Sequence, residues 1–381
     1  MRIAIFSDTY VPEVNGVART LKRLADYLTE REIDYKLFVP ETLESTAPKT
    51  PTIERFRSIP FMLYRECRLA FPNVVHLKQS VEAFNPDIIH VATPFNLGLF
   101  AHHFGKKHHI PMVASYHTHF DDYLSYYHLD FLEKWLWKYM KWFHRPFEKV
   151  YVPSESTKAK LAFQDFHSNI DIWGRGVDHD FFTPQKRSTL IKENYGITEK
   201  NIILYAGRIA PEKDIQTVIK TYFNLPKSLF SQTHLIMAGD GPLLSELKEK
   251  YNKEITFTGF ANSDKLAELY ASADIFMFPS ATETFGNVVL EALSSGLPVI
   301  GADKGGTKHL VTDRKTGYLC SPGHVASFTT ACTEVLTNTN LKAYMGRQAR
   351  IQAMAHSWED IFTKLMASYS TVVEQKRKAT A

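Results

Sequence analysis

Two glutamates, Glu283 and Glu291, stand eight positions apart where the sequence predicts a buried strand followed by a helix. The apolar run from Ile275 to Phe278 predicts the strand, and the spacing of apolar residues from Asn287 to Ser294 predicts the helix. Glu283 is therefore expected in the turn and Glu291 on the helix itself. Two carboxylates placed in this way suit a ligand that has hydroxyl groups at both of its ends.

The turn before this helix is suited to an anion. The backbone amides of Phe285, Gly286 and Asn287 open the helix without intrahelical partners, and amides at a helix N-terminus bind phosphate groups. Because Gly286 has no side chain, a phosphate can come close to the backbone there. A phosphate site beside two carboxylates fits a nucleotide sugar. The spacing alone leaves open a solvated helix with an ordinary salt bridge.

Further polar residues follow other predicted strands, at the edge of an open α/β sheet where ligands bind. Arg208 and Lys213 lie five positions apart and can close on one diphosphate, the arginine as a bidentate fork and the lysine as a point charge. Gly16 opens a helix after the first strand, and His117 can hydrogen-bond to a sugar hydroxyl. A surface charge pair, a helix-start glycine and a core histidine are the plain alternatives.

These motifs occur together in one chain, and as a set they resemble the family 4 retaining glycosyltransferases of the GT-B fold. The resemblance is carried by the strings DTYVPEVNGV, SYHTHFDDYL, WGRGVD, GRIAPEKD, TETFGNVVLEA and SWEDIF, which span nearly the whole chain. The string SYHTHFDDYL also resembles the lipid-directed members of the family. Relatives that use GDP-mannose, UDP-glucose or UDP-sulfoquinovose leave the donor open.

The resemblance implies a role for each candidate residue. Arg208 and Lys213 would bind the diphosphate, Glu283 the donor sugar and Glu291 the ribose hydroxyls, while the nucleotide base would pack near Gly259 and Phe260. Catalysis is expected from His117, Arg208, Lys213 and Glu283. Donor binding is expected from Gly16, Gly259, Phe260, Phe285, Gly286, Asn287, Val288 and Glu291. No metal and no other cofactor is expected, because the cations do the work of a metal ion.

Strands and helices alternate in two series, which is typical of α/β proteins with doubly wound sheets. Strands are predicted at residues 2–6, 35–39, 88–91, 112–116 and 150–152, and then at 202–206, 234–237, 255–258, 275–278 and 298–300. We expect a GT-B fold with two Rossmann-like domains that face each other across a cleft. Residues 1–175 would form the acceptor-side domain, 176–360 the nucleotide-sugar domain, and 361–381 a helix returning to the first domain. The region Thr46 to Asn73 has no pattern that assigns it.

Composition narrows the class of protein. The 381 residues include 45 basic and 41 acidic side chains, and a net charge of +4 does not predict a nucleic-acid partner. The cysteines Cys67, Cys320 and Cys332 are odd in number and far apart, which favours a reducing cytosol. A strand begins at once and no apolar run approaches the ~20 residues of a membrane span, so we expect neither a signal peptide nor a transmembrane helix.

A basic and aromatic helix is predicted at Asp130 to Arg145, where four basic residues lie beside three aromatic ones. These are Lys134, Lys138, Lys141 and Arg145, with Trp135, Tyr139 and Trp142. Such a helix is typical of a membrane interface, and Arg55, Arg57, Arg65 and Arg68 add positive charge in the same domain. We therefore expect a lipid acceptor at an anionic membrane surface, with the protein cytoplasmic and peripheral on the inner face of the cell membrane.

Other interpretations remain at this stage. One is a non-enzymatic nucleotide-sugar sensor, which the joint presence of His117, Arg208, Lys213 and Glu283 disfavours. The aromatic residues of that helix could belong to the core, in which case the acceptor would be a soluble sugar. A nucleotide-sugar epimerase of the GT-B fold would bind the same donor without an acceptor. A D-x-D pattern, Asp178 to Asp180, can bind a metal diphosphate in another fold, but it lies in the predicted connection between domains, and we expect no metal there.

Overall fold

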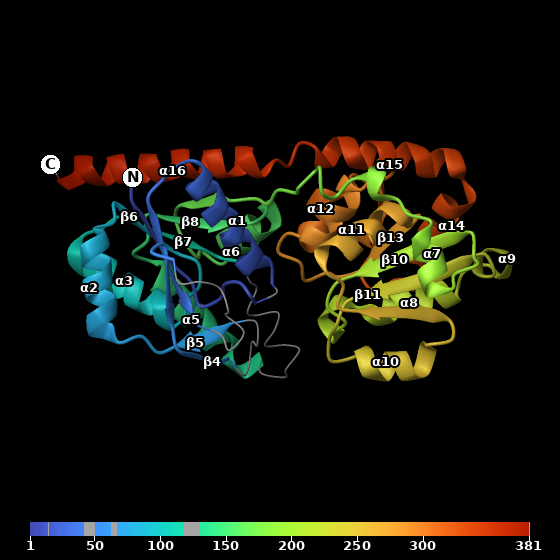
Figure 1. The fold of residues 1–381 in the computed structure, drawn as a ribbon, viewed down its shortest axis with the longest axis horizontal. Helices are drawn as coiled ribbons and strands as arrows, with labels where there is room; N and C mark the ends of the chain where they lie inside the picture. The colour runs from blue at the N-terminus through green and yellow to red at the C-terminus, as the bar shows by residue number, and fades with distance from the viewer. Residues whose placement is uncertain (14, 42–49, 62–66, 118–129, 381) are drawn as a thin grey trace. The chain divides into compact units, whose positions relative to one another are not determined.

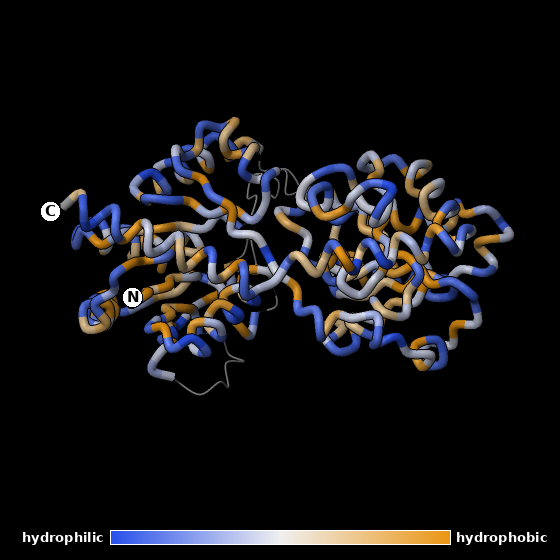
Figure 2. The backbone as a smooth tube through the Cα atoms, turned by 90° about the horizontal axis from the view of Figure 1, so that it is seen from above, coloured by the Kyte–Doolittle hydropathy of each residue, from blue (hydrophilic) through white to orange (hydrophobic). Residues whose placement is uncertain are grey.

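The computed structural model describes residues 1–13, 15–41, 50–61, 67–117 and 130–380, which form two compact units (Figure 1). The first unit contains the described residues up to Gly174 together with those from Glu359 onward, and the second contains Arg175–Trp358. Hydrophobic stretches, orange in Figure 2, run through the interior of each unit.

A parallel sheet is the centre of the first unit. In the described part of that unit, seven strands form it in the order β3-β2-β1-β6-β7-β8-β9. They are β1 (Ile3–Phe6), β2 (Tyr35–Pro40), β3 (Ile53–Phe56), β6 (Ile88–Val91), β7 (Met112–Ser115), β8 (Lys149–Val152) and β9 (Ile170–Ile172). In the register, Ile3 lies opposite Tyr35 on one side and Ile88 on the other. Since β1 is buried at every position, both of its faces are covered, as in other parallel sheets.

Helices and a short ribbon complete the first unit. The helices are α1 (Gly16–Glu30), α2 (Val74–Phe84), α3 (Asn96–His108), α5 (Glu133–His144), α6 (Glu155–Phe163) and α16 (Trp358–Thr380), and the antiparallel ribbon pairs β4 (Ser58–Pro60) with β5 (Arg68–Ala70). Phe6 of β1 packs in one cluster with Leu77 of α2, Ala101 of α3 and Phe143 of α5. The start of α1 is fixed by Asn15, whose side chain accepts a hydrogen bond from the amide of Ala18.

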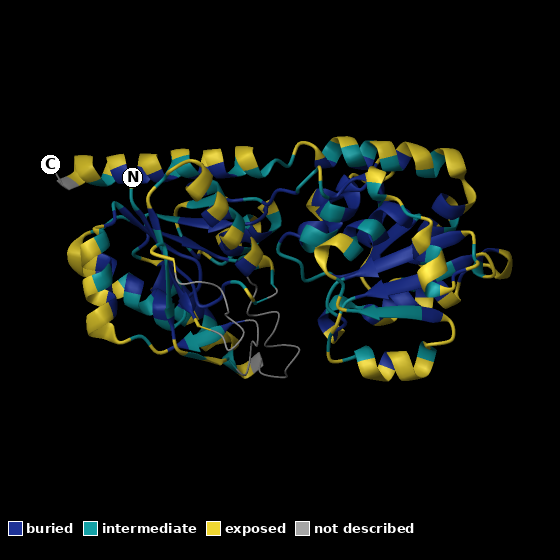
Figure 3. Cartoon of the chain, viewed as in Figure 1, coloured by how far each residue is buried: buried dark blue, intermediate teal, exposed yellow. Residues whose placement is uncertain are grey.

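The second unit repeats this plan. Its described strands are β10 (Asn201–Ala206), β11 (Thr233–Ala238), β12 (Ile255–Gly259), β13 (Ile275–Phe278), β14 (Val299–Ala302) and β15 (Gly317–Cys320), and their order is β12-β11-β10-β13-β14-β15. Its helices are α7 (Leu190–Tyr195), α8 (Ile215–Phe223), α9 (Lys227–Phe230), α10 (Leu244–Tyr251), α11 (Ser263–Ser272), α12 (Asn287–Ser294), α13 (Gly305–Leu310), α14 (Val325–Thr337) and α15 (Thr339–Ala353). Figure 3 shows buried strands in dark blue and the outward sides of helices in yellow.

Both sheets reverse their strand order at one point. In the first unit the chain moves outward from β1 to β3 and then returns to the other side of β1 with β6. In the second unit it moves from β10 to β12 and returns beside β10 with β13. The loops that leave the two central strands separate at such a point and leave a crevice beyond the carboxyl ends of the strands, where ligands bind.

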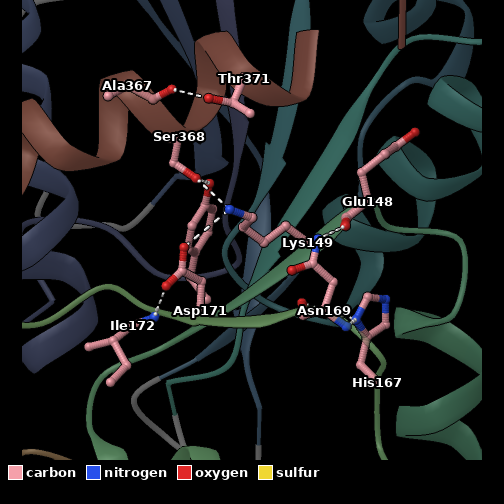
Figure 4. A network of polar contacts seen from close by, with 10 residues as sticks. Glu148, Lys149, His167, Asn169, Asp171, Ile172, Ala367, Ser368 and Thr371 are labelled. Carbon is pink, nitrogen blue, oxygen red and sulfur yellow. Dashed lines mark hydrogen bonds and ion pairs between the residues drawn. The ribbon is translucent and has the colours of Figure 1, made fainter. Parts of the chain in front are cut away.

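Helix α16 is held to the first unit by a polar network (Figure 4). The hydroxyl of Ser368 accepts hydrogen bonds from the ammonium of Lys149 at 3.0 Å and from the hydroxyl of Tyr151 at 2.7 Å. Lys149 also pairs with Asp171 at 3.1 Å. Two turns further along α16, Lys376 pairs with Glu148 at 2.9 Å. These contacts join the last helix to the strands β8 and β9.

The structure confirms the strands predicted from the sequence, with ends that differ by one or two residues. It adds β3 and the β4–β5 ribbon within the unassigned region Thr46 to Asn73, and it adds β9 and β15. The last two are edge strands of three and four residues. Edge strands have a neighbour on one side only, so they need less apolar sequence, and this explains why the pattern does not reveal them. The expected helix from Asp130 begins with a 3-10 turn, and α5 proper starts at Glu133.

Candidate active site

The loop after β10 holds the two expected phosphate-binding cations. A short 3-10 helix, Pro211–Lys213, follows the loop and carries Glu212 and Lys213. The backbone carbonyl of Arg208 accepts a hydrogen bond from the Tyr205 hydroxyl at 2.7 Å, and the Arg208 guanidinium lies 3.4 Å from the carboxylate of Glu212. The side chain of Tyr205 is buried beside Glu212 and Glu283, and burial raises its pKa well above the usual range. Tyr205 of β10 therefore anchors the loop to the sheet, and the charged side chains of Arg208, Glu212 and Lys213 lie beyond the end of that strand.

The loop after β13 brings Glu283 to the same place. The ammonium of Lys213 lies 2.5 Å from the Glu283 carboxylate, and the hydroxyl of Ser280 donates a hydrogen bond to the same oxygen at 3.2 Å. The hydroxyl of Thr282 reaches back to the carbonyl of Glu212 at 3.2 Å. Because β10 and β13 are the neighbours at which the strand order reverses, the structure brings these residues to the ligand edge of the sheet.

The N-terminus of α12 lies directly after this loop. Gly286 occupies the helix cap with a φ of +97°, which strains any other residue, and no side chain caps the helix. The amides of the first turn are thus left to a ligand or to water. The side-chain oxygen of Asn287 is buried and has no hydrogen-bond partner among the described residues. Val288 and Phe285 flank these groups and are half-buried and buried.

A pair of glycines, Gly305 and Gly306, which the sequence analysis did not single out as functional, packs against the backbone of this turn. The amide of Gly306 donates to the carbonyl of Glu283 at 2.7 Å, and a Cβ at Gly306 would come within 2.2 Å of the Phe285 carbonyl oxygen. Gly305 has a φ of +62°, and a Cβ there would come within 2.8 Å of the Glu283 carbonyl oxygen. The signal for this contact is present in the sequence as Gly305-Gly306 after a buried strand, a place where two backbones approach closely.

The remaining candidates of the second unit lie along the same edge. Glu291 extends from α12 and accepts a hydrogen bond from the hydroxyl of the buried Tyr270 at 3.2 Å. Gly259 ends β12 with a φ of +68°, and Phe260 beyond it is 61% exposed. The carbonyl of Gly259 accepts from the amide of Gly239, which follows β11. The structure thus pairs Lys213 directly with Glu283, and it places Arg208, which contacts Glu212, in the same loop after β10. Gly259 and Phe260 lie two strands away from β10.

A pocket lies beyond the ends of β1, β6 and β7 in the first unit. His117 lines the pocket, and so does Asn15, which immediately precedes Gly16. The side-chain amide of Asn15 donates to the hydroxyl of Thr9 at 2.8 Å. The sequence analysis missed Thr93, Ser115 and His144, which line the same pocket. Thr93 and Ser115 stand at strand ends, where a polar residue is a signal that could have found them.

Among the buried ionisable residues of this unit, Asp8 and His144 have shifted pKa values. Burial raises the pKa of Asp8 to about 7, although hydrogen bonds from the backbone of α3 and from Thr93 lower it. Its carboxylate accepts from the amide of Leu97 at 3.1 Å and from the hydroxyl of Thr93 at 2.8 Å, so it caps α3. Burial lowers the pKa of His144 to about 4, and its Nδ1 donates to the carbonyl of Met140 at 2.8 Å. The imidazole of His144 is therefore neutral at pH 7.

Other sequence candidates fall outside this machinery. His119 and the rest of the string after His117, up to Leu124, lie outside the described residues. The carboxylate of Asp178 accepts from the amide of Phe181 at 3.0 Å, which makes the D-x-D pattern part of a turn. Within the part of the chain that the structure describes, no three histidine, cysteine, aspartate or glutamate side chains gather as a metal site.

Helix α5 turns different residues to the core and to the solvent. Trp137, Met140 and Phe143 are buried, whereas Trp135 is 70% and Trp142 55% exposed. The interpretation that assigned the aromatic stripe to the core is therefore wrong for both of these tryptophans. Tyr139 is half-buried, and its hydroxyl donates to the carbonyl of Pro94. On the solvent side, Lys134, Lys138 and Arg145 are exposed and Lys141 is half-buried.

The sequence analysis expected Arg55, Arg57, Arg65 and Arg68 to add positive charge at a membrane surface. This prediction is wrong for Arg55 and Arg68. Arg55 donates to the carbonyls of Pro40 and Val11, and its guanidinium lies over the Tyr10 ring. Arg68 pairs with Glu13 at 3.3 Å. Both side chains are therefore half-buried and engaged by partners within the unit. Arg57 is exposed, and Arg65 lies outside the described residues. No helix in the described ranges is long and apolar enough to cross a bilayer.

Two family models match the chain. The model described as Glycosyltransferase Family 4 matches residues 14–181, and the one described as Glycosyl transferases group 1 matches residues 187–352. Sulfoquinovosyl transferase SQD2 of Arabidopsis thaliana is 30% identical over 99% of this chain and 75% of its own length. An alpha-monoglucosyldiacylglycerol synthase of Streptococcus pneumoniae is also 30% identical, over 84% of this chain and 75% of its own. A GDP-mannose-dependent alpha-mannosyltransferase of Mycobacterium tuberculosis is 28% identical over 98% and 97%.

Solved structures share the fold at lower identity. Sucrose-phosphate synthase (tll1590) from Thermosynechococcus elongatus has a TM-score of 0.79 at 19% identity and covers 98% of this chain and 100% of its own. Anabaena Alr3699/HepE in complex with UDP-glucose has a TM-score of 0.75 at 18% identity and covers 97% and 100%. At these identities the likeness concerns the fold, which is GT-B, with two parallel sheets flanked by helices.

Proposed function

The chain belongs to glycosyltransferase family 4 and has the GT-B fold, and we propose that it transfers a hexosyl unit from a nucleotide-diphosphate sugar to a membrane lipid with retention of the anomeric configuration. The observation that carries this proposal is the cluster of Arg208, Lys213 and Glu283 at the edge where β10 and β13 end. It combines two cations with a carboxylate, beside uncapped helix amides. A diphosphate linked to a sugar needs this combination.

The chemistry that we propose is a displacement at the anomeric carbon of the donor. The bond from that carbon to the diphosphate oxygen breaks, and the acceptor hydroxyl oxygen forms the new bond from the same face. The hydroxyl proton passes to the departing phosphate oxygen, which lies on that face. Arg208, Lys213 and the amides of α12 stabilise the negative charge that grows on the diphosphate. One such donor is typically worth about 3 kcal/mol of barrier.

The donor contacts follow from the positions of the other candidates. Glu283 would accept hydrogen bonds from sugar hydroxyls, Glu291 from the ribose, and the base would lie near Gly259 and Phe260. Tyr270 supports the position of Glu291, because its hydroxyl holds that carboxylate. The names of relatives support either a GDP-linked or a UDP-linked donor, since one is called GDP-mannose-dependent and the Anabaena protein is in complex with UDP-glucose.

A lipid acceptor is supported by the outer face of α5. Trp135 and Trp142 are exposed beside Lys134 and Lys138, which is the composition of an interfacial helix. Each basic group near an anionic surface adds about 1 kcal/mol of attraction. One relative, a monoglucosyldiacylglycerol synthase, names a glycolipid as its product. We propose that the protein docks reversibly on the inner face of the cell membrane and glycosylates a lipid there.

A panel of nucleotide sugars tests the donor. The full-length protein should be stabilised against heat by one of GDP-mannose, UDP-glucose and UDP-sulfoquinovose, and it should transfer the sugar to diacylglycerol or a glycolipid in mixed vesicles. The product anomer, read by NMR, should match that of the donor. Transfer only to water-soluble sugars would replace the lipid by a soluble acceptor. Interconversion of the donor without any acceptor would make the protein an epimerase.

Metal independence has its own test. The proposal assigns the neutralisation of the diphosphate to Arg208 and Lys213, so turnover should stay within about twofold after treatment with a chelator. Loss of activity with rescue by Mg²⁺ or Mn²⁺ would contradict this assignment.

A further inference from the structure

Both cations of the diphosphate site are paired with carboxylates in the structure, and the two pairs are not equivalent. Lys213 and Glu283 lie 2.5 Å apart with side chains only 16% and 17% exposed. Arg208 and Glu212 lie 3.4 Å apart, and Arg208 is the more exposed partner at 33%. The first pair joins the loop after β10 to the loop after β13, whereas the second lies within a single loop.

The two carboxylates, Glu212 and Glu283, also differ in whether a bound ligand could donate hydrogen bonds to them. Glu212 belongs to the same short helix as Lys213, is largely buried, and has its backbone carbonyl bonded to Thr282. Glu283 is the residue to which the proposed function assigns the sugar hydroxyls. Its ion pair with Lys213 therefore ties the group that would recognise the phosphate to the group that would recognise the sugar.

A diphosphate that draws the ammonium of Lys213 away from Glu283 leaves a partly buried carboxylate. Removing one partner of such a pair is costly, because the remaining charge has lost its compensation and regains little water. Ser280 supplies one hydrogen bond to Glu283, and one neutral donor does not replace an ammonium ion. The hydroxyls of a donor sugar supply the missing donors. A nucleoside diphosphate lacks these sugar hydroxyls, and its ribose hydroxyls are assigned to Glu291 in the proposed function.

We propose that the Lys213–Glu283 ion pair makes phosphate recognition depend on sugar recognition, so that the site favours the intact nucleotide sugar over the nucleoside diphosphate that the reaction releases. This inference rests on the proposed function, and it assigns to Glu283 a second role as the partner that restrains Lys213. The pair re-forms when the sugar leaves with the acceptor, and its return weakens the hold on the diphosphate product. The Lys213–Glu283 ion pair thereby limits inhibition by the nucleoside diphosphate product.

The test compares ligand pairs in the full-length protein. Dissociation constants are measured by calorimetry for UDP with UDP-glucose and for GDP with GDP-mannose, in the wild type and in Glu283→Gln. Glutamine keeps the size of the side chain and removes its charge. We expect Glu283→Gln to bind the nucleoside diphosphate several-fold more tightly and to lose about tenfold of the preference for the nucleotide sugar, a coupling of ordinary size between two binding events.

Glu212→Gln is the matched control, because it makes the same change beside the other cation. Its preference for the nucleotide sugar should equal that of the wild type, since Glu212 contacts no sugar in this proposal. In a Lys213→Met background, Glu283→Gln should no longer tighten binding of the nucleoside diphosphate. Melting curves of each variant without ligand confirm that the chain is folded before binding is compared.

The outcomes separate the inference from the function. If the wild type binds nucleotides but Glu283→Gln keeps the wild-type preference, or binds the nucleoside diphosphate more weakly, the inference is overturned and the glycosyltransferase proposal stands. If Glu212→Gln loses the preference to the same extent, the effect is one of net charge, and the specific pairing is again overturned. If the wild type binds no nucleotide and no nucleotide sugar, both proposals fall.

Discussion

The two sheets of this protein have the same strand order up to their last strands, yet the loops beyond their reversal points carry different chemistry. Beyond β10 and β13 lie Arg208, Lys213 and Glu283, which are charged and only partly shielded from solvent. Beyond β1, β6 and β7 the pocket is bordered by neutral polar groups such as Thr93 and Ser115, and by the neutral imidazole of His144. The same backbone plan thus places charged groups beyond one sheet and uncharged hydrogen-bonding groups beyond the other.

Asp8 is an acidic residue of the first unit whose side chain does not line the pocket. It follows β1 directly, as the loop with Arg208 follows β10, but its carboxylate turns inward and caps α3. The acid is thereby used for structure, and the groups left at the pocket are hydrogen-bonding hydroxyls and rings. Topology therefore decides where a ligand can bind, while the residues after each strand decide which ligand it is.

The largest effect is expected where the second unit meets the diphosphate. Arg208→Ala and Lys213→Ala should each reduce turnover by about two to three orders of magnitude, because charge grows on the diphosphate as the bond breaks. Steady-state rates with saturating donor measure this loss. Lys220→Ala on α8, which changes an exposed lysine outside the cluster, should leave turnover unchanged. Unchanged turnover in both variants of the cluster would remove the assignment of the phosphate site.

The next effect concerns the outer face of the first unit. Changing Lys134 and Lys138 together to Glu should reduce binding to anionic liposomes by more than about tenfold, since each basic group contributes about 1 kcal/mol near such a surface. Co-sedimentation at low and high salt measures it. The same reversal at Lys248 and Lys250 of α10, which are exposed in the second unit, is the control and should have little effect. Equal binding by both double variants would show that α5 is not the docking element.

A smaller and more selective effect is expected at Glu291. Glu291→Ala should weaken donor binding by about tenfold and change turnover at saturation by much less, because contacts to the ribose are similar in the ground state and the transition state. Tyr270→Phe should give a weaker version of the same change, since it removes only the hydroxyl that holds the carboxylate. A defect confined to turnover would contradict the ribose assignment and move Glu291 toward the reacting centre.

The smallest effect is expected in stability and concerns Asp8. Burial raises the pKa of this carboxyl group from 3.8 to about 7. A group that binds its proton more tightly in the folded chain contributes stability at low pH and loses it as the pH rises through the folded pKa. Asp8→Asn, which cannot ionise, should therefore gain several degrees in melting temperature relative to the wild type as the pH rises from 4 to 7.5.

The comparison with the wild type at each pH isolates Asp8 from His144. Burial lowers the pKa of His144 to about 4, so its contribution runs in the opposite direction, and it is the same in both proteins. A constant difference in melting temperature at all pH values would mean that Asp8 is ionised throughout and that the amides of α3 dominate over burial.

Much of the framework could be read from short segments of the sequence. Apolar runs such as Ile3–Phe6 and Ile275–Phe278 predict buried strands, because a strand in a parallel sheet is covered on both faces and needs no polar alternation. Gly286 before an apolar helix marks an uncapped N-terminus. Since ligands bind beyond strand ends, the residues that follow each run were candidates before any contact was known.

Only the tertiary structure decided which of these candidates meet and which way each side chain turns. Lys213 and Glu283 are 70 positions apart, and their pairing exists because β13 lies beside β10 in the sheet order. The inward turn of Asp8, Arg55 and Arg68 and the outward turn of Trp135 depend in the same way on neighbours distant in the chain. Local residue pattern fixes the backbone conformation of a segment, whereas the partner of a charged or aromatic side chain is set by long-range packing.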